Sequence, residues 1–344
     1  MKKNKKLGCL SLLLLSPYSI AMQPMDDQSL ATMTGQDGLT IQAQANVEFK
    51  QLSMIDNDGL SYGSGSSLYT SPDYTKRAGL VIGGQTSSSP VRVVGLNGSS
   101  ETILGFNAVI DSDVGTVLNK GAFTNIALSF NSNITGIRIS PFSVYAASES
   151  TLSDIISNSY TKNTIYDSST LKPKAGLVKE IVRVGGASGI DIVFAANKPT
   201  VNIQLGAAPQ GHMIMFGGAI NSICGSGSGC NIVAVSDYDG SNNPYGIGFD
   251  FQFTGYNNSP FGLTGFYAGI EGKNGTDSGG LVFGNSGVSD KFNLSLNNVI
   301  LGQSGSPSTT YPSSTFNGLP NASIGSIGAV GASVTNLKMK VSGM

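Results

Sequence analysis

The chain has 344 residues and a formal net charge of -1, and only 12% of its residues are charged, against a usual ~25%. This balance argues against nucleic-acid binding, which needs a basic face. Apolar residues make up 40% of the chain, and their arrangement in alternating runs predicts a buried core.

The first 21 residues have the pattern of a Sec signal peptide. Four lysines precede the apolar run LGCLSLLLL, a helix-breaking Pro17 follows it, and small residues stand at Ser19 and Ala21. The run is too short to span a bilayer, so we expect cleavage after Ala21 and loss of Cys9 with the leader. Residues 22–344 are then expected to form a secreted β domain without a transmembrane segment. We expect it outside the cell, on the cell surface or in the periplasm.

Two short helices are predicted. Residues 25–35, MDDQSLATMTG, have Asp26 or Asp27 as a cap and Gly35 as a stop. The second helix is expected within SESTLSDIISNSY, residues 148–160. The Ser- and Lys-rich passage 148–175 is either an internal domain boundary or an insertion into a single sandwich.

Alternation of apolar and polar residues with period two recurs along the chain and predicts half-buried strands. The final run ASIGSIGAVGASVTNL, residues 322–337, instead spaces its apolar residues by three, which suggests a winding loop more than a strand. The alternating segments are TIQAQANVEFK (40–50), TVNIQLG (200–206), GFDFQFTG (248–255), KFNLSLNN (291–298) and LKMKVSG (337–343).

Asp-Gly and Asn-Gly pairs separate many of these strands. Both pairs favour the positive φ angles of tight hairpins, so the strands are expected to be antiparallel. We therefore predict an all-β fold, an antiparallel β-sandwich or jelly-roll-like domain with long Gly-, Ser- and Asn-rich loops.

Two acidic turns suggest weak calcium sites. DNDG contains Asp56 and Asp58, and DYDGSNN contains Asp237, Asp239 and Asn242. Alternating side-chain oxygens near a glycine suit calcium, but both segments lack the distal glutamate of an EF-hand loop. Asp and Asn also precede Gly in turns for backbone reasons alone, which is the stronger interpretation. We expect no other cofactor.

The two cysteines that remain after cleavage are Cys224 and Cys230, in ICGSGSGCN. In an oxidising compartment they are expected to form a disulfide across a short loop. The only histidine, His212, cannot supply a metal set alone, and no nucleophile elbow follows it. Carboxylates are scarce and no glycosidase pair stands out. We therefore predict that the protein is not an enzyme and has no catalytic residues.

Four tyrosines occur within the Gly- and Asn-rich region 236–275. A flat aromatic ring stacks on the apolar face of a sugar, so these residues could form a carbohydrate-binding surface. The same composition is ordinary in β loops, and that interpretation carries more weight. The residues are Tyr238, Tyr245, Tyr256 and Tyr267.

The N-terminal segment MQPMDDQSLATMTGQDGLTIQAQANVEF resembles the start of a family of secreted gammaproteobacterial proteins that includes the Fil-type pilus system protein FilA. The closing segment TNLKMKVSG is similar to the C-terminal ends of that family. The resemblance implies a surface or pilus-associated location and no catalytic residues. The matching positions are Asp26, Asp27, Leu30, Thr34, Gly35, Gln36, Asp37, Gly38 and Leu39.

The sequence thus predicts a non-catalytic structural or adhesive component of a pilus- or fimbria-like system, with a role in cell adhesion and biofilm. Its partners would be other surface proteins or copies of itself. The proposed assembly strand carries Leu337, Met339 and Val341, because an edge strand can accept or donate pairing. The alternative is a carbohydrate-binding or carbohydrate-cleaving exoprotein that uses the loops of 236–275.

Overall fold

A computed structural model describes residues 38–56, 78–116, 121–148, 164–185, 189–236, 245–272, 279–303 and 322–342. The chain separates into two compact units, Met1–Leu39 and Thr40–Met344. Only residues 38 and 39 of the first unit are described, so the account below concerns the second. The predicted calcium residues Asp58, Asp237, Asp239 and Asn242, Tyr238, and both predicted helices lie outside the described residues.

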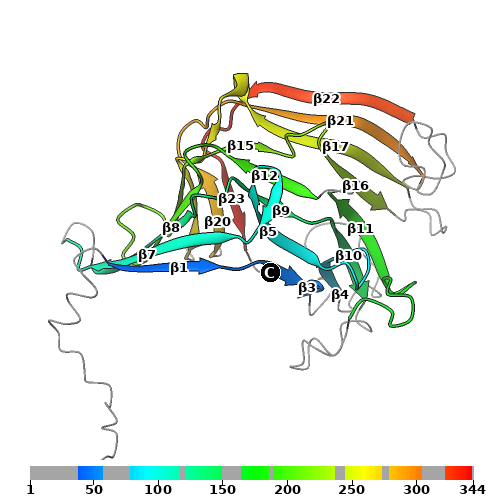
Figure 1. The fold of residues 1–344 in the computed structure, drawn as a ribbon, viewed down its shortest axis with the longest axis horizontal. Helices are drawn as coiled ribbons and strands as arrows, with labels where there is room; N and C mark the ends of the chain where they lie inside the picture. The colour runs from blue at the N-terminus through cyan, green and yellow to red at the C-terminus, as the bar shows by residue number, and fades with distance from the viewer. Residues whose placement is uncertain are drawn as a thin grey trace, which may run out of the picture. The chain divides into compact units, whose positions relative to one another are not determined.

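The described chain is almost entirely antiparallel β structure, and its open sheets form a sandwich-like arrangement, which confirms the predicted fold class (Figure 1). The first sheet, sheet A, has eight strands that follow one another in space in the same order as in the sequence. They are β1 (Leu39–Gln44), β7 (Gly105–Asp113), β8 (Phe123–Phe130), β13 (Thr200–Gly206), β14 (Ile214–Gly217), β19 (Phe266–Glu271), β20 (Gly280–Asn285) and β23 (Lys338–Val341).

The second sheet, sheet B, contains the remaining described strands. Its main path runs, in spatial order, β2 (Val47–Phe49), β5 (Val91–Asn97), β9 (Gly136–Ile139), β12 (Ile190–Phe194), β15 (Ala219–Ile223), β17 (Tyr245–Gly255), β16 (Cys230–Ser236), β11 (Val178–Val184), β10 (Phe142–Ser148), β4 (Ala78–Gly83) and β3 (Gln51–Asp56). Four further strands attach to this path: β6 (Ser100–Thr102) on β5, β18 (Phe261–Gly262) on β15, β21 (Phe292–Gln303) on β17, and β22 (Ala322–Ala332) on β21.

The two sheets share a border that the chain crosses repeatedly. Strands that are consecutive in sequence belong to different sheets at β1–β2, β6–β7, β8–β9, β12–β13, β14–β15, β18–β19, β20–β21 and β22–β23. Between β14 and β15 a single residue, Gly218, makes the crossing with φ +72°. A Cβ there would collide with the carbonyl oxygen of Lys198, so the sharp bend requires glycine.

The largest apolar cluster includes residues from both sides of this border. Its buried members are Ile134, Phe194, Ile220 and Phe261, and the Phe130 and Phe194 rings, one from each sheet, have centroids 4.6 Å apart. Burying these aromatic rings together is what holds the two sheets against each other.

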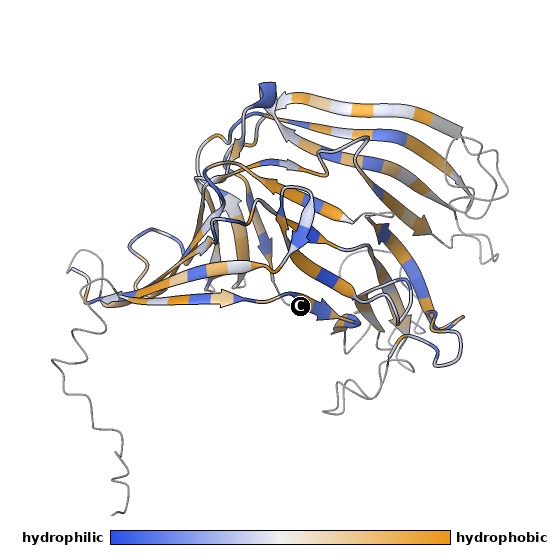
Figure 2. Ribbon diagram, viewed as in Figure 1, coloured by the Kyte–Doolittle hydropathy of each residue, from blue (hydrophilic) through white to orange (hydrophobic). Residues whose placement is uncertain are grey.

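Each sheet also has an apolar row in which directly paired residues from successive strands lie on one face. Figure 2 shows the resulting alternation of apolar and polar residues along the strands. The row in sheet A is Ile110, Ile126, Ile203, Ile214, Ala268, Phe283 and Met339, and the row in sheet B is Leu52, Ile82, Val144, Val182, Ala234, Ile247 and Leu301.

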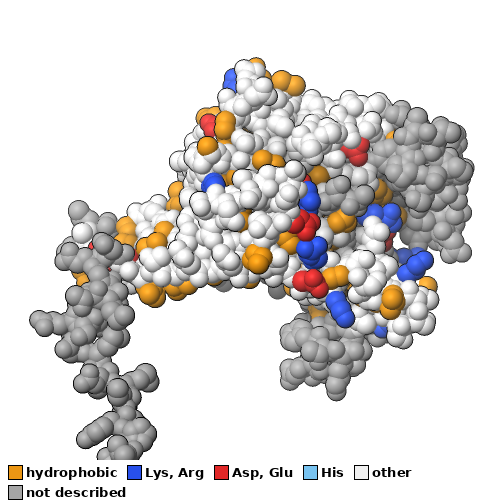
Figure 3. Space-filling model, viewed as in Figure 1, with side chains coloured by type: hydrophobic (Ala, Val, Ile, Leu, Met, Phe, Trp, Pro, Cys, Tyr) orange, Lys and Arg blue, Asp and Glu red, His pale blue; other side chains and the backbone are white. Residues whose placement is uncertain are grey.

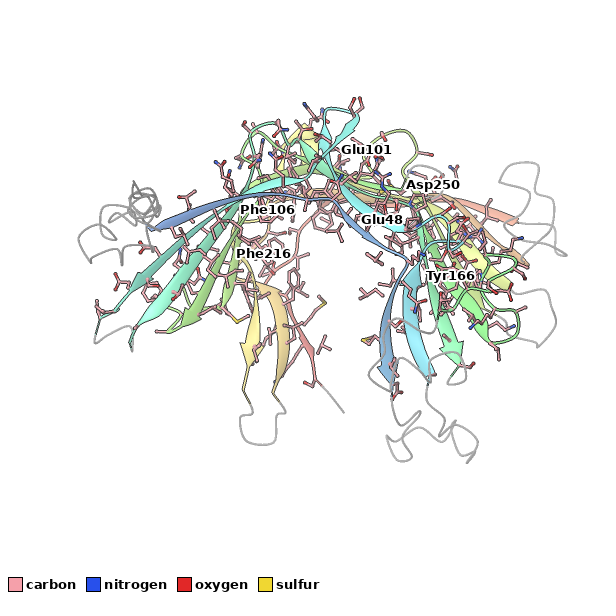
Figure 4. All side chains as sticks on the ribbon, turned by 60° about the horizontal axis from the view of Figure 1, so that its bottom comes forward. Glu48, Glu101, Phe106, Tyr166, Phe216 and Asp250 are labelled. Atoms are coloured by element: carbon pink, nitrogen blue, oxygen red, sulfur yellow. A yellow bond between two sulfur atoms is a disulfide. The ribbon has the colours of Figure 1, made fainter. Side chains whose placement is uncertain are left out.

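A second core lies where residues 164–178 cover β4 and β10. Ile165 and Tyr166 are buried there against Val81 and Tyr145, and Figure 4 labels Tyr166 on the sheet B side. The Tyr166 hydroxyl donates a hydrogen bond to the Gly84 carbonyl at 2.6 Å. The described end of the passage 148–175 is therefore packed into sheet B, within the unit Thr40–Met344.

The prediction for the final Gly-rich run is wrong. Residues 322–332 form the long strand β22, not a winding loop. Gly325 and Gly331 have φ values of +97° and +67° and lie where the register between β21 and β22 is irregular. The spacing of three between apolar residues therefore reflects β-bulges within a strand.

In the part of the chain that the structure describes, the single helical segment is the 3₁₀ turn η3 (Tyr256–Asn258). No helix in that part is long and apolar enough to cross a membrane.

Candidate functional site

The predicted disulfide is present. Cys224 follows β15 and Cys230 begins β16, and their Cα atoms are 5.3 Å apart. Both residues are buried, so the bond fixes the base of the Ser- and Gly-rich tip between them. This confirms the predicted disulfide across a short loop.

A cavity of about 300 Å³ adjoins the disulfide and contains two carboxylates, Asp191 and Asp250. Both are held by hydrogen bonds. Asp191 accepts two bonds from the Arg138 guanidinium, each 2.7 Å long. Asp250 accepts from Asn231 at 3.2 Å and from Asn298 at 2.7 Å. These contacts explain the two carboxylates as structural groups that join neighbouring strands.

Asp191 belongs to a line of charges across sheet B. The Glu101 carboxylate lies 3.0 Å from Arg92 and 3.7 Å from Arg138. The hydrogen bond to Asp191 is the main cause that raises the pKa of Arg138. Figure 3 shows several charged side chains of both signs close together near the middle of the face in view. The opposite charges in this line cancel one another, in keeping with the low net charge of the chain.

The described tyrosines of the predicted carbohydrate-binding surface lie in different parts of the structure. Tyr245 begins β17, and its side chain lies outside the described residues. Tyr256 lies in η3, where its ring is 3.3 Å from the position a Cβ of Gly331 would take and 5.9 Å from the Lys291 ammonium. Tyr267 lies in β19 of sheet A and is only 8% exposed.

Sequence reasoning missed the partner of Tyr267. The His212 ring stacks on the Tyr267 ring, with centroids 3.6 Å apart and planes 4° apart, so one face of Tyr267 is covered. His212 precedes β14, which is the direct neighbour of β19 in the sheet. Only this pairing of strands brings together two residues that are 55 positions apart in sequence (267 minus 212).

A cavity of about 450 Å³ lies beside this ring pair, on the more polar face of sheet A. Its lining includes Gln204, His212, Tyr267 and Glu271. The Glu271 carboxylate is 2.7 Å from the Lys338 ammonium of β23. The Gln204 amide donates to Asn125 Oδ1 at 3.0 Å and accepts from the Gln210 backbone at 3.1 Å. The side-chain amides in this cavity mainly make hydrogen bonds within sheet A and its loops, and the His212 ring is the aromatic group that stacks on Tyr267.

Among the described residues, no group of three or more His, Cys, Asp or Glu side chains is placed to hold a metal ion. Asp56 ends β3 and is exposed. Because the other predicted calcium residues lie outside the described ranges, calcium binding stays a prediction from the sequence.

The predicted assembly strand is β23, and it is the last strand of sheet A among those described. It pairs with β20, so that Met339 lies opposite Phe283 and Val341 lies opposite Leu281. Met339 is 51% exposed and Val341 is 70% exposed. The lysines between them flank Glu271, with Lys338 at 2.7 Å and Lys340 at 4.0 Å.

A second open edge belongs to β22. This strand pairs with β21, and among the described strands none pairs with its other side. It contains eleven residues without a charge or a proline, ASIGSIGAVGA, and Figure 2 shows only neutral and apolar colours along it. Its large apolar side chains, Ile324, Ile327 and Val330, are 54%, 55% and 80% exposed.

Comparison with known proteins yields one family. A family described as "Family of unknown function (DUF6160)" matches residues 1–88 of this chain, a range that holds the predicted leader, the acidic segment and β1 to β4. No curated protein and no solved structure matches the chain.

Proposed function

We propose that this protein is a secreted, non-catalytic structural or adhesive subunit of a pilus- or fimbria-like surface assembly. It would join neighbouring subunits by adding strands at open sheet edges. The observation that carries the proposal is β22, a long edge strand without a charge and with three exposed apolar side chains. Export is supported by the leader pattern in residues 1–21.

The composition of β22 supports this role because natural proteins usually protect an open edge. They place lysine, proline or inward-pointing charges there, since unpaired backbone groups otherwise recruit another chain. β23 carries such charges in Lys338 and Lys340, whereas β22 has neither a charge nor a proline and is interrupted only by the bulges near Gly325 and Gly331. An edge kept neutral and apolar over eleven residues is what strand addition requires, because the backbone provides affinity and the side chains provide register.

β23 supports assembly by accepting a strand, which is one of the two possibilities that the sequence suggests. Its Met339 lies opposite Phe283 and is the last member of the apolar row of sheet A, and its backbone already pairs with β20. It can therefore accept a strand on the side where no described strand pairs with it, while donating itself would break its pairing with β20. Met339 and Val341 remain the residues that a partner strand would contact.

Negative-stain microscopy and sedimentation of the exported full chain test this proposal. We expect assemblies that grow with protein concentration and that are lost when lysines replace Ile324 and Val330. The matched control is Ile270→Lys, at an exposed isoleucine in an interior strand (72% exposed), which should leave assembly intact. A chain that stays monomeric at every concentration would refute the proposal.

The second candidate is saccharide binding at the cavity beside His212 and Tyr267. The specific observation in its favour is the stacked ring pair in a cavity that also contains the Gln204 amide and the Glu271 carboxylate. On a glycan array, His212→Ala should then abolish retention, while Ile324→Lys should not affect it. Equal retention of His212→Ala and the unmodified chain would reject this candidate.

A further inference from the structure

We infer that the partner of the β22 edge is β22 of a second copy, paired antiparallel about a twofold axis at Ile327. This inference rests on the proposed strand-edge assembly and names its partner and register. Ile327 is the central residue of Ala322–Ala332, and the other two exposed apolar residues lie three positions on either side of it. In antiparallel self-pairing about Ile327, Ile324 of one copy faces Val330 of the other.

This register is the self-complementary one. Directly opposed residues project to the same face of a sheet and contact each other. The axis at Ile327 therefore matches Ile327 with its copy and makes two Ile324–Val330 contacts. A shift by one residue would place Ile327 opposite Ser326 or Gly328 of the partner and would lose all three contacts.

The local conformation leaves a regular segment of β22 that begins at Ile327. The register between β21 and β22 is irregular around Gly325 and near the Gly331 end, where both glycines have positive φ. Between these points Ile327, Gly328 and Ala329 pair in order with Leu296, Ser295 and Leu294. The middle of β22 is thus a regular strand that can extend sheet B into a second copy.

Charge favours pairing at β22 over pairing at β23. β22 has no charged side chain, so pairing it with itself brings no like charges together. Self-pairing of β23 would gather Lys338 and Lys340 from both copies on one short strand pair, which like-charge repulsion disfavours. A twofold interface uses the same patch on each subunit, as most soluble homo-oligomers do.

A charge-swap mixing experiment tests the inference. In Ile327→Lys the twofold axis places lysine against lysine, so self-association should weaken about tenfold or more. Ile327→Glu should behave in the same way. A mixture of the two variants should form dimers again, because lysine then faces glutamate. Sedimentation velocity measures each case, and circular dichroism confirms that both variants keep their β structure.

Cysteine cross-linking provides an independent readout. Directly opposed residues in antiparallel strands have Cα atoms about 4.5–5.5 Å apart, which suits a disulfide. Ile327→Cys should therefore give a covalent dimer on mild oxidation, while the native cysteines are already joined to each other. Ile270→Cys, at a position that is more exposed (72% against 55%), should remain monomeric.

Two results would overturn the inference, and they have different meanings. If the unmodified chain associates but mixing the charge variants restores no dimer, β22 pairs with a different edge and only the twofold register is wrong. If the unmodified chain is monomeric at all concentrations and Ile327→Cys cross-links no faster than Ile270→Cys, strand-edge assembly fails as well.

Discussion

Two buried tyrosines donate hydrogen bonds to one carbonyl oxygen, and this arrangement predicts a strongly non-additive effect on stability. The Tyr145 hydroxyl lies 2.9 Å from the Gly84 oxygen and the Tyr166 hydroxyl lies 2.6 Å from it. Both tyrosines are 2% exposed. Replacing either one by phenylalanine leaves the other hydroxyl bound to the carbonyl.

The expected magnitudes follow from that geometry. Each single substitution removes one hydrogen bond and should lower the free energy of unfolding by about 1 kcal/mol. The double substitution Tyr145→Phe and Tyr166→Phe deprives the buried Gly84 carbonyl of both donors. It should cost about 1–3 kcal/mol more than the sum of the single substitutions, because an unsatisfied buried acceptor carries its full desolvation penalty.

Urea denaturation of the four proteins in this cycle measures the coupling. The signal is the far-ultraviolet circular dichroism of the β structure. The free energy of unfolding should fall with urea concentration at the same slope in all four proteins, so that the midpoints report stability. Ile270→Ala, at an exposed position, serves as a control and should change stability by less than about 0.5 kcal/mol. Additivity within about 0.5 kcal/mol would refute the shared-carbonyl explanation.

Three further predictions concern pH, the disulfide and the core between the sheets. Burial raises the pKa of Tyr145 from 10.0 to about 12, so the folded chain keeps a proton that the unfolded chain loses. This stabilisation is complete below pH 10 and should fall by about 3 kcal/mol as the pH rises to about 12; urea midpoints across that interval should decline less in Tyr145→Phe. Reducing the bond between Cys224 and Cys230 should cost about 2 kcal/mol, since it closes a short loop, and an unchanged midpoint with reductant would contradict this. Phe261→Ala should lower the free energy of unfolding by about 3–5 kcal/mol, measured in the same assay, and a loss below about 1 kcal/mol would show that the ring cluster does not hold the sheets together.

The sequence alone determined the fold class, several strands and the disulfide. Residues 200–206 alternate with period two and form β13 over those same residues, because alternation reports directly which side chains share a face. The Asn97-Gly98 pair forms the predicted hairpin, with Asn97 paired to Ser100 and Gly98 at φ +62°. The pairing of Cys224 with Cys230 was predicted because they are the two cysteines left after the expected cleavage and an oxidising compartment was expected.

Strand pairing decided the remaining features of the fold and of the candidate site, because the alternation of apolar and polar residues does not say which strand lies beside which. The run 40–50 reads as one strand, yet it divides at Ala45 and Asn46, where the Ala45 amide donates to the Leu104 carbonyl at 2.9 Å and the chain passes between sheets. Pairing with β21 makes Gly325 and Gly331 bulge positions and turns an apparent loop into β22. The stacking of His212 on Tyr267 and the open edge at Ile327 likewise depend on long-range neighbours, which local sequence patterns do not contain.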